Sequence, residues 1–485
     1  MRPPKYTLLL PYLAVLIGCQ GLAPTEKTRI PFLQMTIPDN WTAFAKASDQ
    51  PDQADQADQA DRPDAKVAMD TGENQTGDPT PSWLDDFDDP RLHALVREAF
   101  GKNFDLEAAL ARVKAARAQA KRQGAEKLPE LTADSSASRS KSAITNTTSS
   151  NLDLGINISW EIDLWNRLDN AAKAAVADGK AQQAEYRMAK LALAANVAKA
   201  WFDAIESDQQ LRLAEKTVRS FENSLRTIEQ RYRLGIGPAL DVRLTRENVA
   251  TAHSQREIRA RNRDTAVRSL EILLGGYPAA SLNIQPNLPE LRQAVPVGLP
   301  SDLLNRRPDI IAAQARLLAT DHRLAAARAN RLPSVRLTAS GGTASDELHN
   351  LLRADSLLWQ LIGNLTQPLW DGGRLSAQVE IAAANRQQAS AKYAAVALRA
   401  FREVESALTA EVLLAKQEAA LRIATQEANA AAVLALDQYR QGLSDIVTLL
   451  STQRREFDAK RSLLAVTKQR LNTRIDLYLA LGGGF

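Results

Sequence analysis

The stretch LDLGINISWEIDL, from Leu152 to Leu164, decides the fold class of this chain. Every even-numbered position holds an apolar residue, and every odd-numbered position holds a polar residue or glycine. Side chains in a β-strand point alternately to opposite faces, so this pattern predicts a strand with one apolar and one polar face. A strand of this length and pattern fits a membrane barrel whose lumen is filled with water.

Three further segments supply partners for this strand. The segment from Leu131 to about Lys141 lies just before it and is rich in serine. Later in the chain, Val335, Leu337 and Ala339 alternate with polar residues, and Leu357 to Trp370 follows. Four strands cannot close a barrel, for which about eight is the practical minimum. An open sheet edge is not tolerated in lipid, so several chains must share one barrel. Two chains would give about eight strands and three about twelve, and the pattern leaves both open.

Most of the remaining sequence predicts long helices. Aromatic residues make up only 5% of the chain and charged residues 24%, a balance typical of long helices. No glycine or proline interrupts residues 374–441, which could form a helix roughly 100 Å long. Lys180 to Leu234 is also unbroken. Globular helices average about a dozen residues, so both must lie against other long helices. Shorter helices are expected from about Asp105 to Glu126 and from about Pro308 to Asn330.

From Trp83 onward the sequence is duplicated. Tyr232-Arg233-Leu234-Gly235 recurs as Tyr439-Arg440-Gln441-Gly442, and Leu164-Trp165 recurs as Leu369-Trp370. A proline-rich seam separates the two halves. Each half predicts a helix, two strands, a very long helix, a tight glycine turn and another long helix.

The first residues form an export signal. Arg2 and Lys5 give it a positive start, and the apolar segment that follows is far shorter than the roughly 20 residues of a spanning helix. It ends in Leu16-Ile17-Gly18-Cys19, which resembles the lipobox of bacterial lipoproteins, and Cys19 is the only cysteine in the chain. The resemblance implies that Cys19 is acylated, and Gln20 after it points to the outer membrane. The alternative is an ordinary signal sequence that contains a cysteine.

The segment after Cys19 has little apolar content and repeats the triplet Asp-Gln-Ala. Such a segment cannot bury enough surface to offset the entropy of ordering, so we interpret it as a tether. The chain is therefore divided into a lipoprotein signal peptide (1–18), an acylated tether of low complexity (19–82), a first repeat (83–284) and a second repeat (285–485).

Several motifs resemble the outer membrane factor family of TolC-like channels, particularly its NodT-type lipoprotein branch. They are GLPSDLLNRRPDI from Gly298 to Ile310, Leu164-Trp165-Asn166-Arg167, Leu240-Asp241-Val242 and the closing Ala480-Leu481-Gly482-Gly483-Gly484. The resemblance runs from about Trp83 to the C-terminus. It implies a homotrimer with a twelve-stranded β-barrel in outer-membrane lipid, continued by a periplasmic α-helical barrel. It also implies an efflux role with a periplasmic adaptor (a membrane fusion protein) and an inner-membrane pump of the RND type.

In that family, the turns between paired long helices form the periplasmic aperture. The corresponding turns here are Tyr232 to Val242 and Tyr439 to Leu450. By this resemblance the aperture candidates are Tyr232, Tyr439, Asp241 and Asp445. Two positions that are acidic in better-known members hold Thr448 and Ser451 here, which weakens the match in the second half. The alternative is that all four candidates are ordinary turn and helix-end residues.

No enzymatic, cofactor or metal site is expected. The four histidines are scattered without metal-ligand spacing, and no free thiol would remain after acylation. The net charge of +4 is small, and Glu257 and Asp264 interrupt the arginine-rich residues 256–268, so no nucleic-acid partner is expected. The competing hypothesis is a periplasmic coiled-coil scaffold lipoprotein without a pore. It accounts for the helices but not for the duplicated alternating strands.

Overall fold

The computed structural model describes residues 41, 80–144, 146–291, 295, 298 and 300–483. The signal peptide and Cys19 lie outside the described residues, as does the tether apart from residues 41 and 80–82. The expectations for those segments therefore stay predictions.

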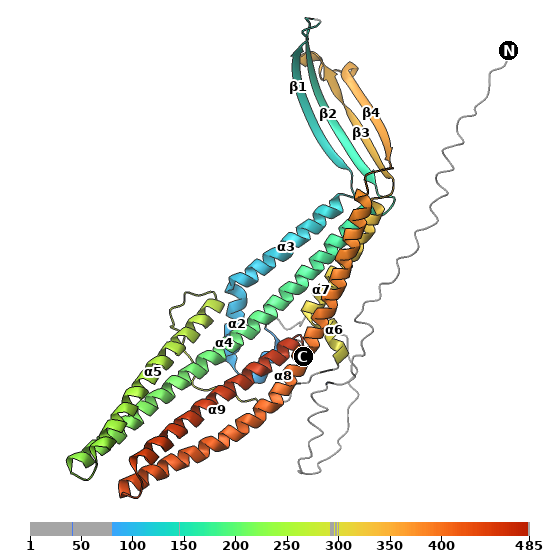
Figure 1. The fold of residues 1–485 in the computed structure, drawn as a ribbon. Helices are drawn as coiled ribbons and strands as arrows, with labels where there is room; N and C mark the ends of the chain where they lie inside the picture. The colour runs from blue at the N-terminus through green and yellow to red at the C-terminus, as the bar shows by residue number, and fades with distance from the viewer. Residues whose placement is uncertain are drawn as a thin grey trace, which may run out of the picture. The chain divides into compact units, whose positions relative to one another are not determined.

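The same series of elements occurs twice along the described chain (Figure 1). In each pass a helix leads into two strands, a very long helix and a shorter antiparallel helix. The first pass comprises η3 (Ser82–Phe87), α2 (Pro90–Lys102), α3 (Phe104–Ala125), β1 (Glu130–Lys141), β2 (Thr148–Ile162), α4 (Arg167–Arg233) and α5 (Ala239–Leu273). The second comprises η4 (Pro300–Asp302), α6 (Leu303–Arg306), α7 (Pro308–Ala329), β3 (Ser334–Ser345), η5 (Leu348–Asn350), η6 (Ala354–Ser356), β4 (Leu357–Thr366), α8 (Arg374–Gln441) and α9 (Ile446–Ala480).

The four strands form one antiparallel sheet in the order β1-β2-β3-β4. Ile158 pairs with Leu131 on one side and with Ala339 on the other, so the apolar positions of neighbouring strands share one face. The expected alternation of β2 is confirmed. Both long edges of the sheet, along β1 and β4, have no strand partner among the described residues.

Several strand boundaries differ from the sequence expectation. β1 begins at Glu130, one residue before Leu131, and β2 ends at Ile162, two residues before Leu164. β2 begins at Thr148 rather than Leu152, because polar residues also pair with β1 beyond the apolar run. β4 ends at Thr366 rather than Trp370. Pro368 follows within two residues and has no N–H to donate to a ladder, so the strand cannot continue through it.

Burial along the middle of β2 is inverted relative to a water-soluble protein. The apolar side chains from Leu154 to Trp160 are exposed, for example Ile158 at 40%, whereas the residues between them are half-buried. Trp359 on β4 is 80% exposed on the same face. A contiguous apolar face of this kind marks a surface that contacts lipid or another chain.

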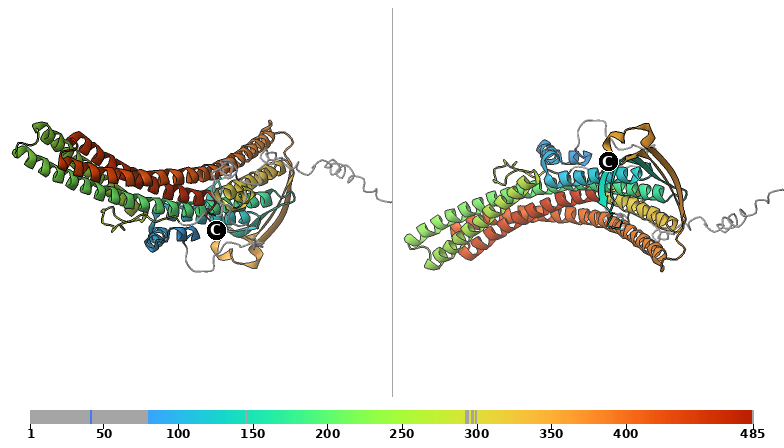
Figure 2. Two further views of the ribbon diagram at one scale, coloured as in Figure 1. Left: turned by 90° about the horizontal axis from the view of Figure 1, so that it is seen from below. Right: turned by 90° about the horizontal axis from the view of Figure 1, so that it is seen from above.

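The two longest helices pack in antiparallel pairs with their successors, α4 with α5 and α8 with α9, and the pairs lie side by side (Figure 2). The 68 residues of α8 match the sequence expectation because Gly373 and Gly442 flank it with φ of 88° and 76°. Such left-handed conformations are readily available only to glycine. Together, α4 and α8 set the length of the helical part.

α4 is longer than expected: it begins at Arg167 instead of Lys180 and runs through Gly179. Glycine inside a helix costs only about 1 kcal/mol, and the buried alanines Ala177 and Ala181 continue the packing on either side of Gly179. The true start is fixed by Asp163, whose carboxylate accepts the backbone N–H groups of Leu168 and Asp169 at 3.1 and 2.7 Å.

The largest hydrophobic core lies where η3 and α2 pack against α4 and the C-terminal part of α9. Trp83 stacks on Tyr478 with ring centroids 5.6 Å apart, and Phe87 contacts Phe202. The segment that leads into α2 is thereby fixed to the middle of the helices. None of the helices in the described ranges combines the length and the apolar character needed to cross a bilayer.

Candidate functional site

The polar sheet face, formed by the residues opposite the apolar ones, is a hydrogen-bonded surface. Asp134 on β1 accepts a hydrogen bond from Asn157 Nδ2 at 2.5 Å. Asp153 on β2 accepts from Ser136 Oγ at 2.9 Å and from Asn151 Nδ2 at 2.6 Å. These polar groups lie on the face opposite the exposed apolar side chains, so this face can line a water-filled path.

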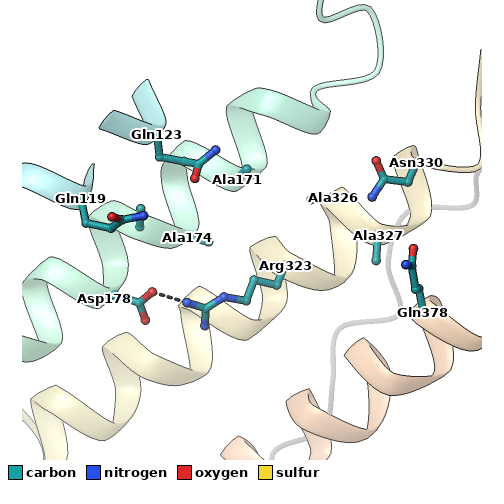
Figure 3. Close-up of a pocket in the computed structure, with 11 residues that line it drawn as sticks. Gln119, Gln123, Ala171, Ala174, Asp178, Arg323, Ala326, Ala327, Asn330 and Gln378 are labelled. Carbon is teal, nitrogen blue, oxygen red and sulfur yellow. Dashed lines mark hydrogen bonds and ion pairs between the residues drawn. The ribbon is translucent and has the colours of Figure 1, made fainter. Parts of the chain in front are cut away.

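A cavity of about 490 Å³ opens between α3, α4, α7 and α8 (Figure 3). An ion pair between Arg323 of α7 and Asp178 of α4 crosses it. Alanine methyls, amide side chains and one neutralised ion pair offer no nucleophile or acid–base pair. Its lining consists of Gln119, Gln123, Ala171, Ala174, Ala175, Asp178, Arg323, Ala326, Ala327, Asn330 and Gln378.

Arg307 connects three helices at the start of the second pass. It is 3% exposed, and its guanidinium donates to Asp309 at 3.0 and 2.8 Å and to Glu403 of α8 at 2.8 Å. The third contact, Nη1 to the carbonyl of Ala480 at 2.8 Å, holds the end of α9. Burial alone would lower the pKa of Arg307, but the carboxylates of Asp309 and Glu403 outweigh it and raise that pKa. The group therefore stays charged and holds α7, α8 and α9 together.

A second buried arginine ties η3 to the long helices. Arg474 of α9 contacts Asp86 at 3.3 Å and Glu411 of α8 at 2.8 Å. The hydroxyl of Tyr478 donates to the same Asp86 carboxylate at 2.9 Å. Burial and the Asp86 charge raise the pKa of Tyr478 to about 12. Tyr478 therefore remains a hydrogen-bond donor at neutral pH.

The helix turns far from the sheet are linked to each other within one chain. Tyr439 of α8 is 5% exposed, and its hydroxyl donates to Asp241 Oδ2 in the first turn of α5 at 3.4 Å. The guanidinium of Arg231 lies over the Tyr439 ring, 5.2 Å from its centroid, and donates to the carbonyl of Arg440 at 3.4 Å. Burial is the main cause that raises the pKa of Tyr439, followed by the charge of Asp241, and Arg231 opposes both.

The other two aperture candidates lie apart from this contact. Asp445 is the N-cap of α9 and accepts the Thr448 N–H at 2.7 Å; this hydrogen bond lowers the Asp445 pKa. Tyr232 is 49% exposed. The structure therefore brings Asp241 and Tyr439 together but neither Tyr232 nor Asp445 with them. No local sequence pattern marks Arg231, because the residues it contacts lie about two hundred positions away in the sequence.

No three histidine, cysteine, aspartate or glutamate side chains in the described part of the chain lie close enough together to hold a metal ion. The described residues instead form an extended surface that consists of the polar sheet face and the long helices. A few side-chain contacts link the helix turns at the end far from the sheet.

Comparison with known proteins places these features in context. The family model described as outer membrane efflux protein matches residues 95–276 and 299–483. The outer membrane protein OprJ of Pseudomonas aeruginosa is 32% identical over 495 aligned residues, covering 100% of this chain and 97% of OprJ. The cation efflux system protein CusC of Escherichia coli (strain K12) is 31% identical over 413 residues, covering 83% of this chain and 88% of CusC.

A solved structure agrees with the fold. The crystal structure of a membrane protein from Pseudomonas aeruginosa has a TM-score of 0.79 and 32% sequence identity to this chain. The match covers 88% of this chain and 100% of that chain.

Proposed function

The chain belongs to the outer membrane efflux protein family, and from that membership we propose how its parts build a conduit. It is the outer-membrane channel component of an efflux system, with a TolC-like fold. Three copies close their sheets into a twelve-stranded barrel in outer-membrane lipid. Their helices α4, α5, α8 and α9 continue the path as a helical barrel through the periplasm.

The observation that carries this proposal is the inverted burial along the middle of β2. Apolar side chains there are exposed and the polar sheet face is hydrogen-bonded, as in a barrel with lipid outside and water inside. The edges of β1 and β4 have no strand partner within the described ranges. Since such edges cannot remain open in lipid, we expect them to pair with other chains. A scaffold without a pore would leave the apolar face without a role. Single-channel conductance of the purified protein in planar bilayers distinguishes the two functions, because only a channel conducts.

The partners follow from the same role. CusC is named as part of a cation efflux system, which supports a multi-component assembly for this chain. We expect substrates to enter from an inner-membrane pump of the RND type through a periplasmic adaptor. The chain itself carries out no reaction in this scheme. The repeats 83–284 and 285–485 each contribute one pair of strands and one pair of long helices.

The lipid anchor is proposed from the sequence alone. Cys19 directly follows the signal peptide of residues 1–18, and residues 19–82 form the tether that begins with the acylated cysteine and leads to the first repeat. Cys19→Ser should abolish the incorporation of radiolabelled palmitate, because the chain contains no other cysteine. Conductance should be kept, since the barrel holds itself in the membrane. Palmitate labelling of the variant at the parental level would contradict the anchor.

For the aperture, we propose that the Asp241–Tyr439 contact helps to hold the turns together. Tyr439→Phe removes only the hydroxyl and its hydrogen bond, at a distance of 3.4 Å. A hydrogen bond of this kind contributes about 0.5–1 kcal/mol per chain, so opening should become roughly two- to fivefold more favourable per chain. Higher conductance in planar bilayers is the expected result.

Two further variants separate charge from contact. Asp241→Asn keeps an acceptor for Tyr439 but removes a charge that would recur around the pore axis, so cation selectivity should fall. Asp445→Asn should have the smaller effect on conductance, because the Asp445 carboxylate is already engaged by Thr448. Parental conductance and selectivity in both Tyr439→Phe and Asp241→Asn would place the constriction elsewhere, for example at Tyr232.

A further inference from the structure

We propose that Arg139 and Lys141, on the outer face of β1, bind phosphate groups of anionic lipids in the outer leaflet of the outer membrane. The inference rests on the proposed barrel, in which the apolar sheet face is the outer one. Nothing in the proposed channel function requires these two residues.

The register fixes the face on which the two cations lie. Leu131 pairs with Ile158, and the alternation along β1 carries that face through Ala137 to Arg139 and Lys141. Both cationic side chains are exposed. The outer face of β1 thus changes along the strand from apolar to small to positively charged.

Their height along the strand matches one membrane boundary. Trp160, also on the outer face, donates its indole N–H to the Lys127 carbonyl at 3.0 Å near the helix end of the sheet, as expected of an interfacial tryptophan. It lies one step beyond Ser159, which pairs with Glu130. Roughly ten residues of strand separate that level from Arg139, which at about 3.3 Å each and a tilt near 40° gives about 25 Å. The apolar band of such barrels is also about 25 Å tall, so Arg139 and Lys141 reach the opposite headgroup layer.

Charge is segregated between the two faces of the β1–β2 pair. The inner face carries carboxylates and the outer face none. In the described residues neither Arg139 nor Lys141 forms an ion pair or side-chain hydrogen bond, and the β1–β2 turn, residues 142–147, holds no charged residue. Two outward cations without an acidic partner, at headgroup height, fit anionic phosphate. The inner carboxylates are Glu130, Asp134, Asp153 and Glu161.

The test measures binding of diphosphorylated lipid A to the full-length protein in phosphatidylethanolamine nanodiscs. Arg139→Gln/Lys141→Gln should weaken binding roughly ten- to thirtyfold, since each cation near an anionic membrane surface contributes about fivefold. Arg139→Lys/Lys141→Arg keeps the charges and should keep most of the binding. Lys216→Gln/Arg219→Gln removes the same charge from exposed positions of α4 and should leave binding unchanged.

Several results would overturn the inference. The first is that lipid A and its dephosphorylated form bind equally well, and the second is that the double glutamine variant binds lipid A as the parent does. The third is that inorganic phosphate competes as well as lipid A itself, which would indicate a site for the free anion. A loss of trimer in lipid-free detergent would instead point to an ion pair with a neighbouring chain, for example with Asp355 before β4. Conductance of the same samples tests the barrel independently: a conducting variant without lipid A binding leaves the channel function intact.

Discussion

Ile158→Arg is expected to remove most of the assembled trimer. Ile158 lies in the middle of β2 between Leu131 and Ala339, on the face that the proposed barrel turns to lipid. An arginine near the bilayer midplane of a barrel costs roughly 2–4 kcal/mol, and every chain of the trimer incurs that cost. The measurement is the yield of heat-modifiable trimer from membranes on a semi-native gel.

The matched control is one residue away. Asn157→Arg places the same side chain on the polar sheet face, next to Asp134, which would accept its hydrogen bonds. We expect trimer yield close to that of the parent. Equal losses for the two variants would show that the outer face of β2 has been assigned incorrectly.

Arg307→Ala should destabilise the folded protein by about 3 kcal/mol, because removing one partner of a buried ion pair leaves the others uncompensated. This value is at the low end of the free-energy cost usual for breaking a buried ion pair, since the carboxylates of Asp309 and Glu403 keep some solvent contact. The loss should appear in denaturant unfolding and as faster proteolysis near the end of α9, whose Ala480 carbonyl loses its donor.

The neighbouring residue provides the control. Arg306 belongs to the same sequence motif but is exposed, so Arg306→Ala should change the free energy of unfolding little. Arg307→Lys should recover only part of the stability, because an ammonium group cannot make the forked contact with Asp309. Equal stabilities of the two alanine variants would refute a structural role for the Arg307 contacts.

The fold could be predicted from the sequence wherever one local signal was strong. Alternation located β2 because each step along a strand reverses the face. α8 was bounded correctly because glycine stands at both ends. The same rule failed for α4, where Gly179 is tolerated inside the helix and the start depends on capping by Asp163. The presence of a glycine is therefore not enough to predict that a helix ends at that position.

The candidate site could be predicted only as far as the turns themselves. Tyr232 and Tyr439 occupy equivalent positions of the duplicated sequence, yet one is exposed and the other buried. That difference arises because Tyr439 packs against the first half of the same chain through Asp241. The contact of Arg307 with Glu403 also joins residues far apart in sequence, at a separation of 96 positions. Local patterns carry no information on such pairings.

The two open edges of the sheet also bear on genetics. In the proposed trimer, neighbouring copies complete β1 and β4, so a chain with one faulty strand still enters assemblies through its intact edge. If faulty and normal chains are made in equal amounts and mix at random, only roughly one trimer in eight contains normal chains alone. A strand mutation on one of two gene copies would then act dominantly, whereas loss of one copy would merely halve the dose.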